Sequence, residues 1–224
     1  MLIIVDNKIP QIAKDKLSAM GDLCLFYSEN IVYREISGHT DIFIFQKDNQ
    51  IIIAPQTPKH IVSKLLEHRI DYKVGNSELG NKYPKTAAYN VSTGDGMIIG
   101  NSKTCDSSIT ELCKNSKWIH SPQSYARCNT IILNKDHIIT SEITVKKAIP
   151  KSLYVNSKQI VLEGFSNGFF GGCAGIHNNK IYIVGSLKYH SQKSEIESYC
   201  KKAAYEIIEL YDGPLIDIGG IFFL

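Results

Sequence analysis

A short apolar run rich in β-branched residues recurs five times along the chain, and this repeat constrains the fold more than any other feature. The runs occupy residues 2–5, 51–54, 97–100, 137–140 and 181–184, so their starts are 40 to 49 residues apart. Runs of this length and composition predict buried strands. A regular interval of this size is typical of repeat architectures, in which each unit buries its apolar face against its neighbours.

The same local signals follow each run. A helical stretch is predicted at residues 10–20, 58–69, 106–115, 141–149 and 192–211. Thr57 is a suitable N-cap before Pro58 at the first turn, whereas Pro150 and the Asp212-Gly213-Pro214 sequence end later helices. A strand is predicted after each helix, at residues 23–27, 71–74, 118–120, 160–163 and 215–218.

Each unit then contains a second strand, which opens with small or polar residues at 38–41, 86–88, 126–128, 171–173 and 219–220. In four units a polar turn leads back to the next apolar run, at 47–49, 94–96, 134–136 and 178–180. Such turns predict hairpins. Because all-parallel barrels and doubly wound sheets do not carry a hairpin in every unit, the predicted fold is an α/β-propeller of five ββαβ units around a central pocket.

We expect one α/β-propeller domain over residues 1–224, with approximate units 2–50, 51–96, 97–136, 137–180 and 181–224. No linker or low-complexity segment divides the chain. Since a single unit cannot bury its apolar face alone, the ring has to close between its last and first units.

Composition narrows the functional class. Apolar residues make up 43% and charged residues 21% of the chain, and the formal net charge of +3 comes from scattered basic residues, so direct nucleic-acid binding is not expected. No leader of secretory type and no membrane-spanning segment is predicted, which favours a cytoplasmic protein without a membrane partner. The six dispersed cysteines predict neither a zinc site nor a disulfide framework, and no phosphate-binding loop implies a cofactor.

The segment Gly38-His39-Thr40-Asp41-Ile42-Phe43-Ile44-Phe45 resembles the G-H-x-D-x-x-x-F signature of agmatine and peptidyl-arginine deiminases. A five-fold ring is also the architecture of their superfamily, the penteins or guanidino-group-modifying enzymes. The resemblance implies that His39 is a general acid and base and that Asp41 holds a substrate guanidinium. The motif lies in the first unit here and in a middle unit in the family, a circular shift that a closed ring tolerates.

The same resemblance implies a cysteine nucleophile at the inner end of a strand two units after the histidine. Counting units from His39 leads to Cys128, and Cys173 is the competing candidate. The sequence around Cys173 is similar to the family's E-G-G-[DN] motif, but Phe170 replaces the glutamate and Cys173 the substrate-binding acid. Either the guanidinium site is rebuilt or the site no longer handles guanidines.

The chemistry that the resemblance implies has clear requirements. A guanidinium is planar and permanently charged, so carboxylates must lie in its plane, and a thiolate must attack its central carbon. Asp41 would hold one edge of the guanidinium, and Glu163 and Asp217, near predicted inner strand ends, could hold another.

Two classes of function stay open at this point. One is a cysteine-dependent hydrolase or deiminase whose partner is a small guanidino or amidino compound. The other is a non-catalytic pentein that binds the ribosome, another protein or a ligand, since a translation initiation factor shares the five-fold ring. The sequence makes no prediction of oligomeric state.

Overall fold

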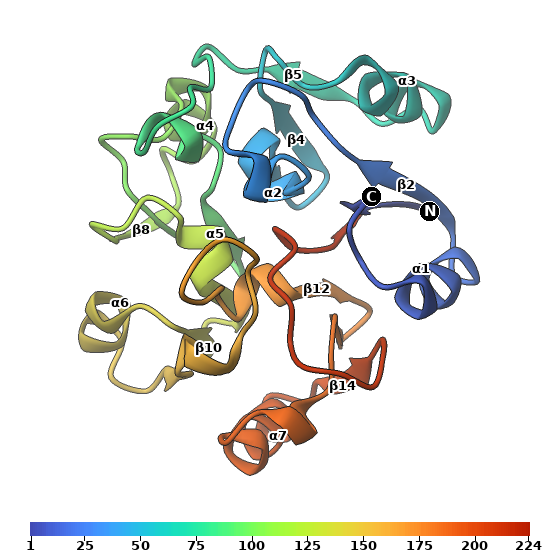
Figure 1. The fold of residues 1–224 in the computed structure, drawn as a ribbon. Coiled ribbons are helices and arrows are strands. Elements are labelled where there is room, and N and C mark those ends of the chain that lie inside the picture. The colour runs from blue at the N-terminus through green and yellow to red at the C-terminus, as the bar shows by residue number, and fades with distance from the viewer.

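Five sheets of three strands each stand around a common axis in the computed structural model, which describes all 224 residues (Figure 1). In every sheet the middle strand pairs antiparallel with an inner strand and parallel with an outer strand. A helix connects each middle strand to its outer strand, and these helices lie at the periphery of the ring. The predicted five-fold α/β ring is therefore confirmed.

The elements repeat in the same order around the ring. The middle strands are β1 (Leu2–Asp6), β4 (Gln50–Ile53), β7 (Met97–Gly100), β10 (His137–Thr140) and β13 (Lys180–Ile183). The inner strands are β3 (Ile44–Lys47), β6 (Ser92–Gly94), β9 (Thr130–Asn134), β12 (Ala174–His177) and β15 (Phe222–Phe223). The outer strands are β2 (Asp22–Phe26), β5 (Tyr72–Val74), β8 (Lys117–His120), β11 (Leu153–Tyr154) and β14 (Glu206–Glu209). The peripheral helices are α1 (Gln11–Ser18), α3 (Lys59–Glu67), α4 (Ser107–Leu112), α6 (Ile143–Ala148) and α7 (Lys193–Lys202).

Short helical turns occupy the positions where the second strands were expected to open. They are α2 (Thr40–Phe43), η2 (Lys85–Ala87), α5 (Ala126–Asn129) and η4 (Gly171–Cys173), and each is followed by an inner strand. Three further turns lie elsewhere, at η1 (Arg34–Ile36), η3 (Ser157–Gln159) and η5 (Leu187–Tyr189). The small residues are needed for packing at the axis: a side chain on Gly171 would collide with the backbone of Arg127 and Cys128.

Two of the predicted outer strands are wrong, because the true ones lie earlier in the chain. In the fifth unit the predicted helix 192–211 ends at Lys202, Ala204 takes a left-handed conformation with φ of 62°, and β14 follows. In the fourth unit the outer strand is β11 rather than residues 160–163. The segments 160–163 and 215–218 instead meet each other through a parallel bridge between Val161 and Ile216.

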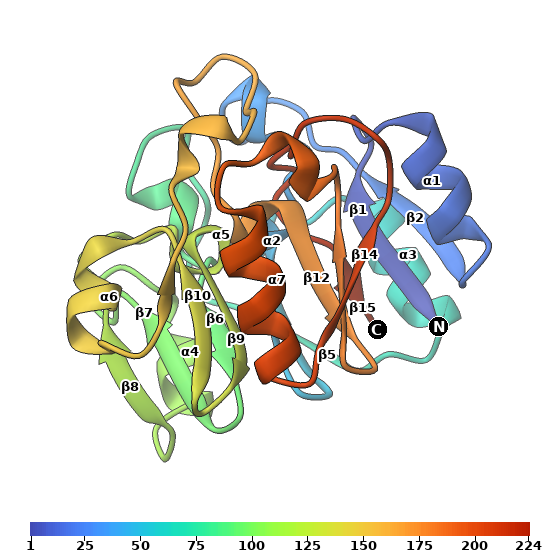
Figure 2. The same ribbon diagram turned by 90° about the horizontal axis from the view of Figure 1, so that it is seen from below.

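The apolar core lies between the sheets and the helices that cover them. Figure 2 shows α7 beside β12 and β14, which form one sheet with β13. Ile196 and Cys200 of α7 belong to the same buried apolar cluster as Ile181 and Ile183 of β13. This follows from the alternation in β13 and the helical spacing in α7, which turn apolar side chains toward each other. None of the helices has the length and apolar character needed to cross a lipid bilayer.

The ring closes through its two chain ends, which lie side by side (Figure 1). β15 pairs antiparallel with β1, and Leu2 and Leu224 exchange two backbone hydrogen bonds of 2.9 Å. Each sheet thus combines the last strand of one sequence unit with the first two strands of the next. The segments that lead from outer to inner strands approach one another at one end of the axis, and this arrangement positions the site.

Candidate active site

A cavity of about 690 Å³ lies among the segments that enter the inner strands. Its wall is formed by Tyr33, Ile36, His39, Ile42, Tyr83, Gln123, Tyr125, Cys128, Leu162, Phe165, Ser166, Asn167, Phe169 and Asp217. Residues from distant parts of the chain meet here because all of these segments converge at the ring axis. A cavity with an apolar wall and a few converging polar groups is the usual form of a small-molecule site.

Cys128 and Asp41 form a direct pair beneath this cavity. Cys128 lies in α5 before β9, Asp41 lies in α2 before β3, and the Cys128 Sγ–H donates to Asp41 Oδ2 at 2.9 Å. The other carboxylate oxygen, Asp41 Oδ1, is buried and has no hydrogen-bond partner within the protein. An orphaned buried carboxylate oxygen is unfavourable, so a ligand N–H would stabilise it.

Asn90 holds this pair in place. Its Nδ2 donates to Cys128 Sγ and to the Asp41 backbone carbonyl, both at 3.2 Å. Its Oδ1 accepts from the backbone N–H groups of Arg127 at 2.8 Å and Cys128 at 3.2 Å. Asn90 therefore orients the nucleophile candidate and the carboxylate at the same time. Sequence reasoning missed this residue, whose one signal is its position just after the small-residue opening of the second inner segment.

Burial controls the ionisation of the Cys128–Asp41 pair. It raises the pKa of the Cys128 thiol well above its ordinary value, and the negative charge of Asp41 adds to this increase. Burial also raises the pKa of Asp41 to about 6, against the attraction of the Arg127 charge. At neutral pH the ligand-free site therefore holds a thiol and not a thiolate.

His39 lies between two buried carboxyl groups. Its Nδ1 is 3.9 Å from Asp217 Oδ1, and its Nε2 is 4.0 Å from Asp6 Oδ2. Burial lowers the pKa of His39 to about 3 and raises the pKa of Asp6 to about 6 and that of Asp217 to about 7. The ligand-free imidazole is therefore uncharged at neutral pH, and the negative charge of Asp6 or Asp217, where these groups are ionised, would stabilise a proton placed on it.

Asp217 is held by backbone donors and by the glycines around it. Its Oδ2 accepts from the Phe169 N–H at 2.8 Å and its Oδ1 from the Gly219 N–H at 3.1 Å. A Cβ atom on Gly172 would overlap the Asp217 carboxylate. The bridge between Val161 and Ile216 delivers Asp217 to this position, because the Asp217 N–H donates to the Val161 carbonyl at 2.9 Å.

Arg127 was also missed by sequence reasoning. Its guanidinium donates to the carbonyls of Gly171 at 2.8 Å and Ala174 at 3.0 Å, and it lies 5.5 Å from the centre of the Phe222 ring. It also lines a second cavity of about 340 Å³, which the inner strands form along the axis. Arg127 thus ties the Cys128 segment to the next unit, and its charge lowers the pKa of Asp41 and Asp217 against the effect of burial.

The predicted site residues divide into two groups. The side chains of Cys128, His39 and Asp217 line the cavity, and Asp41 lies behind Cys128. Cys173 and Glu163 do not line it. Cys173 lies in the apolar core, where its Sγ–H donates to the Phe169 carbonyl at 3.3 Å. Glu163 is exposed to solvent.

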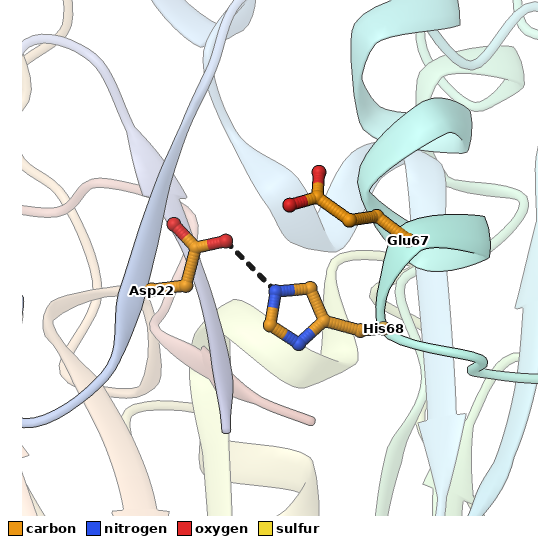
Figure 3. Close-up of side chains that lie close together, drawn as sticks. All are labelled: Asp22, Glu67 and His68. Carbon is orange, nitrogen blue, oxygen red and sulfur yellow. Dashed lines mark hydrogen bonds and ion pairs between the residues drawn. The ribbon is translucent and has the colours of Figure 1, made fainter.

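A separate group of potential metal ligands lies at the periphery (Figure 3). Asp22 on β2 faces Glu67 and His68 at the end of α3, and Asp22 Oδ2 is 2.8 Å from His68 Nε2. The Lys64 ammonium already pairs with both carboxylates, at 2.9 Å from Asp22 and 3.0 Å from Glu67. This group is therefore an ion-pair network that connects the first and second sheets.

The five units around an axial cavity define the fold of the pentein, or guanidino-group-modifying, superfamily. Solved structures with this fold match 93% of the chain. They include DDAH from Pseudomonas aeruginosa complexed with citrulline (7% identity, TM-score 0.51, 91% of that chain). They also include agmatine deiminase from C. jejuni (12% identity, TM-score 0.54, 74% of that chain). A third is the amidinotransferase SxtG of saxitoxin biosynthesis from Microseira wollei (9% identity, TM-score 0.54, 87% of that chain).

Within this fold the chain belongs to the family of unknown function DUF6873, whose model matches residues 4–222. A search of curated proteins finds no match.

Proposed function

We propose that this protein is a cysteine-dependent hydrolase or deiminase that acts on a small guanidino or amidino compound. The observation that carries the proposal is the buried Cys128–Asp41 pair at the wall of the axial cavity, where one Asp41 oxygen lacks a partner. His39 and Asp217 line the same cavity as Cys128, and Asp41 lies directly behind Cys128, so a thiol, an imidazole and a carboxylate converge on one ligand volume with a second carboxylate behind the thiol.

A cationic ligand would also activate the nucleophile. Its positive charge, placed beside Cys128 and Asp41, favours the thiolate over the thiol and so lowers the pKa of Cys128. One of its N–H groups would supply the donor that Asp41 Oδ1 lacks, while the ionised Cys128 would no longer donate to Asp41 Oδ2. The site is then reactive only when it is occupied, which protects the thiol from neutral electrophiles.

The reaction follows from these groups. The Cys128 proton passes to His39, and the sulfur forms a bond to the central carbon of the amidinium, giving a tetrahedral adduct. The C–N bond to the leaving nitrogen then breaks as His39 returns the proton to it. Water adds to the remaining thiouronium while His39 takes one of its protons. The S–C bond then breaks as the C=O bond of the product forms and the hydroxyl proton passes to solvent, and the proton on His39 goes back to the thiolate.

One observation favours a second function, binding without turnover. In the ligand-free site Cys128 is neutral and donates its hydrogen to Asp41, an arrangement that stabilises the resting thiol. A protein that only senses the ligand would need the same carboxylates but no attack by sulfur. Reactivity of Cys128 toward a ligand-like electrophile separates the two functions.

The test is labelling with 2-chloroacetamidine, mapped over all six cysteines by mass spectrometry. Alkylation forms an S–C bond as the C–Cl bond breaks and chloride leaves. The neutral 2-chloroacetamide is the matched reagent, and His39→Ala and Asp41→Asn are the variants. We expect Cys128 to react at least tenfold faster with the amidine than with the amide, and both variants to remove this preference. Equal rates with the two reagents, or labelling spread over the other cysteines, would exclude the hydrolase.

A further inference from the structure

Four aromatic rings form the outer wall of the axial cavity, and we call Tyr33, Tyr83, Tyr125 and Phe165 the aromatic rim. Each ring comes from a different segment between an outer and an inner strand. Tyr33 and Phe165 meet edge to face with centroids 6.4 Å apart, and Tyr83 and Tyr125 pack at 5.6 Å. The two pairs are connected, because the Tyr83 N–H donates to Tyr33 Oη at 2.9 Å.

The charges of the cavity lie only at its inner end. Asp217 lines the inner wall with His39, and Asp41 lies behind Cys128. None of the fourteen lining residues is a lysine or an arginine, and the other polar side chains, such as Gln123 and Asn167, are neutral. A cationic group is therefore favoured at the inner end, whereas a carboxylate on the ligand would meet no cationic side chain in the wall.

The outer end of the cavity favours an apolar group on the ligand over a carboxylate. Removing a carboxylate from water without a partner is strongly unfavourable, and the acidic groups below would repel it. Aromatic rings instead contribute large apolar contact areas and favour flat rings in edge-to-face or offset contacts. The rim therefore discriminates against amino-acid substrates and in favour of apolar substituents.

We infer that the cavity takes a guanidino or amidino compound with an apolar, preferably aromatic, substituent and no carboxylate. The cationic head of this ligand rests on the proposed function. The apolar substituent, which we call the tail, is inferred from the aromatic rim alone. An experiment can therefore contradict the tail without contradicting the cationic head, and the reverse.

The experiment is calorimetric titration of the Cys128→Ser variant, which binds ligands without turnover. The probes are phenethylguanidine, arginine, 3-guanidinopropionate and phenethylurea, the neutral counterpart of the first. We expect phenethylguanidine to bind at least tenfold more tightly than each of the other three. Equal or tighter binding of arginine or 3-guanidinopropionate would overturn the apolar tail and leave the proposed function intact.

Phenethylurea tests whether the site requires a cationic head. If it binds as tightly as phenethylguanidine, the cationic head is wrong and so is the proposed function, while the apolar tail stands. If none of the four probes binds, both inferences are overturned.

A substitution in the aromatic rim tests the contact with the apolar tail independently of the cationic head. Phe165 is 49% exposed, so Phe165→Ala should fold normally. We expect it to weaken phenethylguanidine binding about fivefold and to leave methylguanidine binding unchanged. Tyr189→Ala is the matched control, because Tyr189 is 43% exposed and lies outside the cavity. Unchanged phenethylguanidine affinity in Phe165→Ala would contradict the assignment of the rim.

Discussion

At the scale of single residues, two buried thiols differ in what surrounds them. Cys128 lies at the cavity wall between Asn90 and Asp41, whereas Cys173 lies in the apolar core with only a backbone carbonyl as partner. Burial raises the pKa of both thiols. A cation in the cavity can oppose this effect only at Cys128, so the environment and not the amino-acid type separates the two cysteines.

This difference predicts opposite outcomes for two matched substitutions. Cys128→Ala should abolish labelling by 2-chloroacetamidine. Cys173→Ala should leave Cys128 labelling unchanged and lower the free energy of unfolding by about 1–3 kcal/mol, because it opens a small space in the core. Mass spectrometry and urea unfolding measure the two effects. Labelling that persists in Cys128→Ala, or disappears in Cys173→Ala, would assign the nucleophile to Cys173.

The buried carboxyl of Asp217 predicts a pH effect on stability. Its pKa is about 7 in the folded state against an ordinary value of 3.8, so between pH 4 and 7 the folded state holds a proton that the unfolded state has lost. Raising the pH through this range therefore lowers the free energy of unfolding. The asparagine in Asp217→Asn does not titrate, so this variant lacks the pH-dependent contribution of Asp217 to the free energy of unfolding.

We therefore expect the Tm of Asp217→Asn, relative to the unmodified protein, to be roughly 5 °C higher at pH 8 than at pH 5. Thermal unfolding at the two pH values measures this difference. Glu163→Gln is the control, because Glu163 is exposed and should change neither value. An Asp217→Asn difference that is the same at both pH values would show that this carboxyl does not titrate in the range.

At the scale of elements, the short turns before the inner strands carry the site. They replace the first residues of strands, and their small residues let neighbouring segments approach at the axis. Gly172 in η4 is the clearest case, since a Cβ atom there would overlap Asp217 Oδ1. The glycine is needed for space, because its backbone is not in the left-handed region.

Gly172→Ala should therefore destabilise the fold by about 1–3 kcal/mol and slow amidine labelling of Cys128, because Asp217 must move. Gly80→Ala is the control, because the atoms nearest to its Cβ belong to the Lys85 side chain, from 3.0 Å, and not to Asp217. Urea unfolding and the labelling rate measure both variants. If Gly172→Ala matches Gly80→Ala in both measurements, packing around Asp217 does not determine its position.

At the scale of the whole molecule, the site exists only in the closed ring. His39 and Asp41 enter β3, Cys128 enters β9 and Asp217 enters β15, so three separate segments must converge. β15 also completes the first sheet by pairing with β1. Phe222 of this strand contacts the Arg127 guanidinium, which connects ring closure to the Cys128 segment.

Ring closure predicts different stabilities for a truncated chain and a circularly permuted chain. Deletion of residues 221–224 removes the inner strand of the first sheet and three buried side chains, so it should unfold the protein or lower its Tm by about 10 °C or more. A circular permutant that joins Leu224 to Met1 through a short glycine linker, with new ends at the exposed Asn178-Asn179 turn, should keep the fold. Thermal unfolding distinguishes them, and a truncated chain that melts like the parent would refute closure through β15.

The chain's periodicity determined the architecture. Apolar middle strands, polar hairpin turns and helix boundaries are local signals, so the five-unit α/β ring could be predicted from residue patterns alone. The fifth outer strand could not, because Ile207 and Ile208 fit a helical stripe and a strand equally well in sequence, and the fourth, β11, has only two residues and so no periodicity to detect. Pairing of β14 with β13 decides between these two structures.

The site was predicted in part. The G-H-x-D segment and the repeat indicate His39, Asp41 and a choice of two cysteines. Only tertiary contacts brought Cys128 and Asp217 to the cavity, placed Cys173 in the core and Glu163 in solvent, and recruited Asn90 and Arg127. The physical reason is that strands and turns arise from interactions between neighbouring residues, whereas the cavity arises from segments that meet only when the ring closes.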